Sequence, residues 1–186
     1  MHGYLDKNIF NAYEAGLFFK VAPNKTHKYK GEKCCGEKLS KERITALFCE
    51  SMTDEKRQPR IIGKSKHPRC FKNKDLRNLK YTSNTKAWMT SSITKNELIE
   101  WNSELMRNNN RKVLLLLDNC FAHPNINDLL SQIALVFLPS NTTSILQPLD
   151  QDVIRNFKIF YRKSLISKRI LVADNNEKLK IWMPFE

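Results

Sequence analysis

The sequence lacks long apolar runs, paired cysteines and internal repeats, and each absence excludes a class of protein. No stretch approaches 18 apolar residues in a row, and the opening Met1 to Lys7 has no apolar signal core, so we expect neither a membrane span nor a secretory leader. The five cysteines are odd in number and include no Cys-x-x-Cys pair, which indicates neither a zinc site nor a disulfide framework. We therefore expect an intracellular protein in a reducing compartment.

The charge of the chain is large and unevenly placed. The 186 residues carry a net charge of +13, and 41% of them are hydrophobic, which fits one domain with a real core. Residues 20–80 hold 18 Lys/Arg against 7 Asp/Glu, whereas the remaining residues hold 14 against 12. A phosphate-binding surface needs such a basic sector, because each bound cation releases counterions. The alternative is a solvated surface kept soluble by lysines.

A short acidic motif follows a strongly apolar segment in the second half of the chain. Val113 to Leu117 is an unbroken apolar run that ends at Asp118-Asn119, as expected for a strand buried on both faces. Asp118 is therefore expected at the carboxyl end of a central strand, where open α/β sheets place their sites.

A second acid follows the next apolar run. Ala134 to Leu138 predicts another strand, and Pro148 after it fits the first position of a helix. Asp150 would then lie in the first helical turn, where the helix dipole stabilises an anion by about 0.3–1 kcal/mol. An ionised carboxylate there is able to bind a metal ion. The two acids together suggest metal-dependent phosphoryl chemistry.

Other patterns supply the rest of the fold. Three further strands are predicted, at Asn8 to Tyr13, Arg43 to Cys49 and Pro59 to Gly63. Thr94-Lys95-Asn96-Glu97 has the form of a capping box for a helix with Leu98, Trp101 and Leu105 along one face. A last amphipathic helix is predicted over 153–170, with Val153, Phe157, Phe160 or Tyr161, and Ile166 facing inward.

Several segments resemble the DDE endonuclease domain of pogo/Tigger-type transposases, the family that includes jerky-like and centromere-protein-B-like proteins. The resemblance runs in the expected order from Ile9 to Arg162. It is carried by Gly63-Lys64-Ser65-Lys66, Pro68-Arg69-Cys70-Phe71, Ala87-Trp88-Met89, Leu117-Asp118-Asn119, Ala122-His123-Pro124, Phe137-Leu138-Pro139, Asn141-Thr142-Thr143-Ser144 and Gln147-Pro148-Leu149-Asp150-Gln151.

The resemblance implies an α/β fold of the RNase H-like kind, a mixed central sheet with helices on both faces. It implies one domain over 1–186, with an ordered core of about 8–170. Three acids would meet at the centre of the sheet, and two of them carry over as catalytic and metal-binding residues, Asp118 and Asp150. The implied cofactor is Mg²⁺ or Mn²⁺ if the site is functional.

The first acid of the family departs from its pattern. Family members have Asn-Ala-Asp-Glu-Thr-Gly, and this chain has Asn11-Ala12-Tyr13-Glu14-Ala15-Gly16. Tyr13 thus replaces a metal-binding aspartate, and a phenol with an ordinary pKa near 10 is neutral at pH 7. Glu14 is adjacent, but consecutive strand residues point to opposite faces. It could replace the aspartate only through a bulge or a register shift.

The resemblance also implies a partner and a location. DNA is the expected partner, the nucleus the expected compartment, no membrane contact is expected, and a homodimer stays an open alternative. The helix-turn-helix module that usually precedes this domain is expected to be absent from the chain. The residues expected to contact phosphate are Lys28, Lys30, Lys33, Lys38, Lys41, Lys64, Lys66 and Arg69.

Three functions follow from these patterns. The first is a transposase-derived domain that binds DNA and has lost catalysis through Tyr13. The second is a residual metal-dependent endonuclease that uses Asp118, Asp150 and a repositioned Glu14. The third is a protein-interaction scaffold built on the old cleft. An active enzyme needs a third ligand near Tyr13, and a DNA-binding domain must lose affinity as salt rises.

Overall fold

The computed structural model of the chain describes residues 3–19, 42–139, 147, 149 and 153–174. Within them a six-stranded sheet has the order β4-β3-β2-β1-β5-β6. The strands are β1 (Ile9–Phe18), β2 (Arg43–Ser51), β3 (Arg60–Gly63), β4 (Lys80–Ser83), β5 (Val113–Leu117) and β6 (Ile133–Phe137).

The sheet is mixed. β1, β2 and β3 pair antiparallel in sequence order, whereas β5 and β6 continue the sheet in parallel on the other side of β1. β4 pairs in parallel with β3 at the opposite edge. The sequence predicted all of these strands except β4, and it predicted β1 too short. Tyr13 consequently lies in the middle of a long strand rather than at its end.

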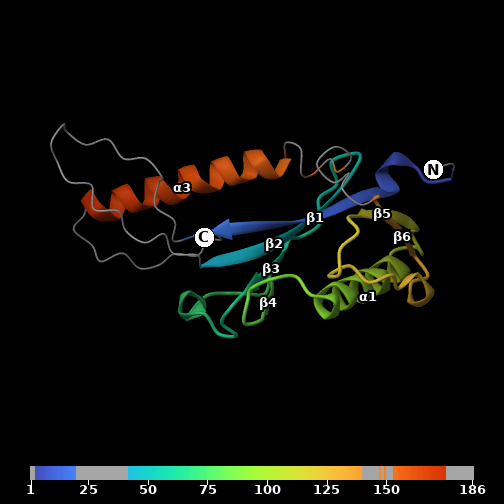
Figure 1. The fold of residues 1–186 in the computed structure, drawn as a ribbon, viewed down its shortest axis with the longest axis horizontal. Helices are drawn as coiled ribbons and strands as arrows, with labels where there is room; N and C mark the ends of the chain where they lie inside the picture. The colour runs from blue at the N-terminus through green and yellow to red at the C-terminus, as the bar shows by residue number, and fades with distance from the viewer. Residues whose placement is uncertain (1–2, 20–41, 140–146, 148, 150–152, 175–186) are drawn as a thin grey trace.

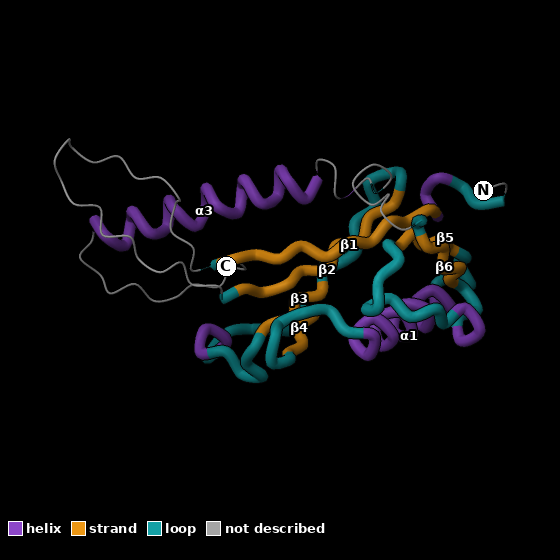
Figure 2. The backbone as a smooth tube through the Cα atoms, viewed as in Figure 1, coloured by secondary structure: helices purple, strands orange, loops and turns teal. Residues whose placement is uncertain are grey.

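Helices cover both faces of the sheet. Figures 1 and 2 show α1 (Ser91–Arg107) on one side and α3 (Ile154–Asp174) on the other. Alternation along β1 divides the core, because Phe10 packs with α1 whereas Leu17 packs with Tyr161 of α3. The mixed sheet with helices on both faces agrees with the fold class that the sequence predicted.

The start of α1 corrects the predicted capping box. The helix begins at Ser91, and the side chain of Thr90 accepts a hydrogen bond from the Ile93 amide at 3.4 Å. Thr94 is therefore inside the helix and cannot be its cap. The predicted apolar face is confirmed, since Leu98 and Trp101 are buried.

The inward face of α3 also differs from the prediction. Ile154 and Tyr161 are buried, and Phe157 packs against Phe48 with ring centroids 4.8 Å apart. In contrast, the side chains of Val153, Phe160 and Ile166 are exposed. The inward positions of Phe157 and Tyr161 are therefore confirmed, whereas Val153 and Ile166 were predicted wrongly because they lie on a neighbouring stripe of the helix.

Short 3-10 helices complete the described elements, at η1 (Asp6–Asn8), η2 (Arg69–Phe71) and η3 (Asn127–Leu129). None of the helices in the described part of the chain has the length and apolar character that a membrane span requires.

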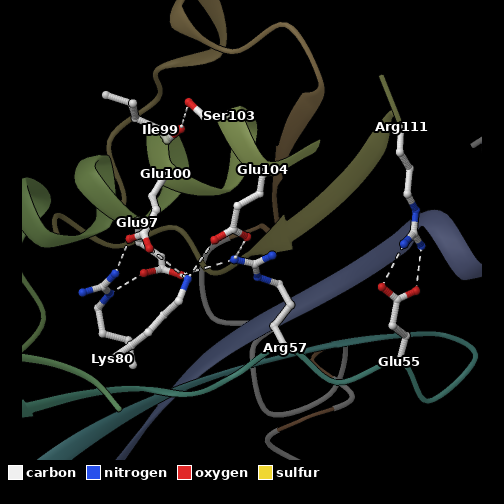
Figure 3. A network of polar contacts seen from close by, with 10 residues as sticks. Glu55, Arg57, Lys80, Glu97, Ile99, Glu100, Ser103, Glu104 and Arg111 are labelled. Carbon is white, nitrogen blue, oxygen red and sulfur yellow. Dashed lines mark hydrogen bonds and ion pairs between the residues drawn. The ribbon is translucent and has the colours of Figure 1, made fainter. Parts of the chain in front are cut away.

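A cluster of ion pairs joins α1 to the sheet (Figure 3). Three cations from the β2–β3 turn, β3 and β4 face three carboxylates on successive turns of α1. Arg60 contacts Glu97, which has a side chain only 9% exposed, and Lys80 lies 3.1 Å from both Glu100 and Glu104. We call this set the α1 ion-pair cluster: Arg57, Arg60, Lys80, Glu97, Glu100 and Glu104.

Candidate functional site

Asp118 lies directly after β5, an interior strand between β1 and β6. Leu115 and Leu117 are buried against α1. This packing holds β5 in place, and Asp118, the next residue after the strand, lies at the edge of the core. The Asp118 side chain is 22% exposed. The predicted position of this acid, at the carboxyl end of a central strand, agrees with the structure.

His123 bridges two carboxylates from different strands. Its side chain is only 1% exposed; Nε2 lies 2.7 Å from Oε1 of Glu14, and Nδ1 lies 2.5 Å from Oδ1 of Asp118. The turn that places the ring is closed by a hydrogen bond from the His123 amide to the Cys120 carbonyl, at 2.9 Å. No pattern in the sequence indicated the contact between His123 and Glu14.

The two carboxylates make this histidine a cation at neutral pH. Burial alone lowers the pKa of His123, but hydrogen bonds and charges from Asp118 and Glu14 outweigh it and raise the pKa to about 11. In return, the hydrogen bond from His123 holds the pKa of Asp118 below its ordinary value. Asp118 is therefore ionised and already faces a positive charge.

Cys120 lies beside this bridge. Its Sγ is 3.4 Å from Nδ1 of His123, and donor atoms of Asp118, Cys120 and His123 all lie within 4.8 Å of one another. Within the described residues, this is the one group of His, Cys, Asp and Glu with separations that suit a metal ion. To bind a metal ion, the His123 imidazole would have to lose a proton, and the contacts with Asp118 and Glu14 oppose that loss by raising its pKa.

Tyr13 and Glu14 point to opposite faces of β1. The β1–β2 register is continuous, with Tyr13 opposite Phe48 and Glu14 opposite Leu47, so no bulge intervenes. Tyr13 packs with Leu149 and Ile154 on the α3 face. Glu14 nevertheless lies near Asp118, because the His123 imidazole contacts both carboxylates. No bulge or register shift in β1 is involved.

Asp150 lies outside the described residues, but two residues close to it are described. The Gln147 side chain, fully buried, donates a hydrogen bond to the Ala12 carbonyl at 2.9 Å. The Leu149 amide donates to Oδ1 of Asn11 at 3.3 Å, and Nδ2 of Asn11 donates to the Leu116 carbonyl at 3.1 Å. Asn11 thus joins β5 to the segment that carries Asp150. Sequence reasoning missed this role, and a polar residue within a buried strand was the available signal.

The predicted phosphate-contact residues divide into two groups. Lys64, Lys66 and Arg69 are exposed on the connection between β3 and β4. The other five lie outside the described residues: Lys28, Lys30, Lys33, Lys38 and Lys41.

This combination of sheet, helices and acid after β5 defines a class of protein, and the comparisons show which one. The DDE superfamily endonuclease family matches residues 41–183 of the chain. The chain belongs to this family.

Similar proteins include Tigger transposable element-derived protein 4 of Mus musculus, which is 36% identical over 179 residues, 96% of this chain and 34% of the mouse protein. CENP-B homolog protein 2 of Schizosaccharomyces pombe is 36% identical over 84% of this chain and 32% of its own length. Jerky protein homolog of Homo sapiens is 32% identical over 84% of this chain and 30% of its own length. The chain therefore spans about a third of the length of these relatives.

Solved structures support the fold. A Mos1 transposase paired-end complex with the left transposon end superimposes with a TM-score of 0.53 at 15% identity, covering 82% of this chain and 41% of the Mos1 chain. A Mos1 mariner paired-end complex with Mn gives a TM-score of 0.52. The fold is thus RNase H-like, as the sequence predicted, and the chain is a transposase-derived DDE endonuclease-like domain.

Proposed function

We propose that this domain binds DNA and does not cleave it, because its first metal-binding acid has become Tyr13. The observation that carries the proposal is the orientation of the two side chains in the middle of β1. Tyr13 occupies the face that also holds Leu149, the neighbour of Asp150. Glu14, the single acid of β1, points to the other face and is engaged by His123.

The donor set does not fit a pair of catalytic metal ions. Two-metal phosphoryl transfer needs ions about 3.5–4 Å apart, held between carboxylates. On the face of β1 that packs against Leu149, the side chain is the phenol of Tyr13 rather than a carboxylate. Asp118 already pairs with the charged ring of His123. The natural chain therefore carries out no cleavage step, and Mg²⁺ or Mn²⁺ has no catalytic role in it.

DNA binding requires exposed cations but no metal-binding carboxylates, and three observations support it. The chain carries a net charge of +13, Lys64, Lys66 and Arg69 are exposed, and a Mos1 transposase of the same fold has been solved with a transposon end. Contacts of this kind are electrostatic and weakly selective for sequence. A nuclear location is part of the same proposal.

The salt dependence of DNA binding tests this function. We expect the affinity for duplex DNA to fall steeply between 50 and 200 mM salt, with a log-log slope of about −0.9 per phosphate contact. Replacing Lys64, Lys66 and Arg69 together by Gln should make the slope shallower by about 1 to 3. The matched control replaces Lys95, Arg107 and Lys112, which are also exposed cations, and should leave the slope nearer the natural value. Absence of binding at low salt would instead favour a protein-interaction scaffold.

A further inference from the structure

The connection between β3 and β4 forms a basic hollow that the proposed function does not yet use. Residues 64–79 carry six Lys/Arg and one acid, Asp75, which pairs with Arg77 at 2.7 Å. A hollow of about 580 Å³ opens on this connection, within the usual range for small-ligand sites. The residues that line it include Lys66, Arg69, Phe71, Lys72, Leu79 and Tyr81.

One wall of the hollow is apolar and held in place. Phe71 and Tyr81 meet edge to face, with ring centroids 4.8 Å apart, and the Tyr81 hydroxyl donates a hydrogen bond to the Ser65 carbonyl at 2.6 Å. The Tyr81 hydroxyl can lie here because residue 63 is glycine: a Cβ on residue 63 would lie only 2.2 Å from the hydroxyl oxygen. The aromatic wall is therefore preformed, which lowers the entropy cost of binding a flat ring.

Among the described residues, no carboxylate pairs with the three cations that line the hollow. In the part of the chain that the structure describes, Lys66, Arg69 and Lys72 are exposed and none of them forms an ion pair. The nearby cations Arg57, Arg60 and Lys80 differ, since each faces carboxylates of α1. Free cations beside an aromatic wall suit a ligand that has both an anion and a planar ring.

We propose that this hollow binds an unpaired nucleotide of DNA, with its phosphate against Lys66, Arg69 and Lys72 and its base against Phe71 and Leu79. The inference rests on the proposed DNA binding and adds a preference for single-stranded ends. A base inside a duplex is stacked between its neighbours and cannot reach the wall. An acidic peptide would satisfy the cations and would leave the aromatic wall without a partner.

The test compares blunt duplex DNA with the same duplex carrying a three-nucleotide single-stranded extension, by fluorescence anisotropy at fixed salt. The natural chain should bind the extended duplex more tightly, by roughly 5- to 100-fold, the range expected from stacking of one base. Phe71→Leu keeps an apolar side chain and should remove this preference. Phe160→Leu is the matched control, because Phe160 is 69% exposed on α3 and lies outside the hollow.

A second variant guards against loss of folding in Phe71→Leu. Lys66→Gln combined with Lys72→Gln changes exposed side chains only and should also reduce the preference, whereas Lys95→Gln with Lys112→Gln should not. Each variant is checked first by thermal unfolding.

Each outcome decides the proposal. Equal affinity for both DNAs, or a preference that survives both hollow variants, overturns the hollow and leaves the proposed DNA binding intact. Absence of binding to either DNA overturns both. Competition by polyglutamate that is unaffected by Phe71→Leu, with no preference for the extension, would mean a surface that recognises charge alone and would also overturn the hollow.

Discussion

His123 is the residue on which the candidate site depends most. Its imidazole is almost fully buried, and each ring nitrogen faces a carboxylate, one from β1 and one from the end of β5. The histidine therefore fixes the positions of the Asp118 and Glu14 carboxylates relative to each other.

We expect His123→Gln to destabilise the fold strongly, because it leaves Glu14 and Asp118 as neighbouring carboxylates without their cation. Removing one partner of a buried ion pair costs about 3–5 kcal/mol, and the lower end applies since both carboxylates retain some access to water. Urea unfolding at pH 7 measures the change. His67→Gln, at an exposed histidine, is the control and should cost little. An equal effect of the two substitutions would contradict the role of His123.

Sequence reasoning at the residue scale succeeded where a side chain follows from its own strand. The position of Asp118 could be predicted because five apolar residues precede it. The contact between Glu14 and His123 could not, because the two are 109 residues apart and no local pattern records their pairing. The partners of Asn11, Leu116 on β5 and Leu149, are also distant in sequence, and the available signal was only a polar residue within a buried strand.

At the element scale, α1 depends on the α1 ion-pair cluster as well as on its apolar face. The carboxylates differ in exposure, with the Glu97 side chain 9% exposed and that of Glu100 45% exposed. Breaking a buried ion pair costs more stability than breaking an exposed one. Glu100 can therefore serve as the control for Glu97 within the same cluster.

We expect Glu97→Gln to lower the free energy of unfolding by about 3–5 kcal/mol, because Arg60 and its neighbours lose a buried counter-charge. Glu100→Gln should cost at most about 1 kcal/mol, since water screens this pair. Chemical denaturation of both variants gives the comparison. If Glu100→Gln proved as costly as Glu97→Gln, burial would not be the deciding factor.

The ion pair between Arg111 and Glu55 predicts sensitivity to acid. Arg111 forms two hydrogen bonds of 2.8 Å with the carboxylate of Glu55 (Figure 3), and these lower the pKa of Glu55 below its ordinary value. A lowered carboxyl pKa contributes stability that is present above the unfolded-state pKa of about 4.3 and is lost as pH falls through the folded-state pKa. The stability that this ion pair contributes should therefore be lost as pH falls below about 4.3.

The matched variant for this prediction is Glu55→Gln. It should be less stable than the natural chain at pH 7 and should lose less stability on acidification, because the titrating group is gone. Parallel urea titrations at pH 7, 5 and 3.5 provide the measurement. Identical pH profiles for the two chains would show that this ion pair does not contribute.

Strands with apolar runs were predictable from the sequence, whereas the short edge strand β4 was not. β5 and β6 followed from their Leu- and Val-rich segments. β4 was missed because every residue in it is half-buried at the edge of the sheet. The start of α1 was misplaced because two threonines four residues apart, Thr90 and Thr94, compete as caps, and tertiary contacts decide between them.

At the scale of the whole molecule, the fold of the family is present, and the proposed loss of catalysis concerns one residue of β1, Tyr13. The RNase H-like sheet, both covering helices and the acid after β5 are present. The core that builds them comes from apolar residues on both faces of the sheet and does not depend on a carboxylate at position 13. Our proposal therefore separates the fold of this domain from catalysis.

The most direct test of this separation is nicking of supercoiled plasmid in the presence of Mn²⁺. The natural chain is compared with Tyr13→Asp, and with Tyr13→Asp combined with Asp118→Asn. We predict no nicking by the natural chain, nicking by Tyr13→Asp, and loss of that activity in the double variant. Nicking by the natural chain that disappears in Asp118→Asn alone would contradict the proposal, because the site would then be active with Tyr13 in place.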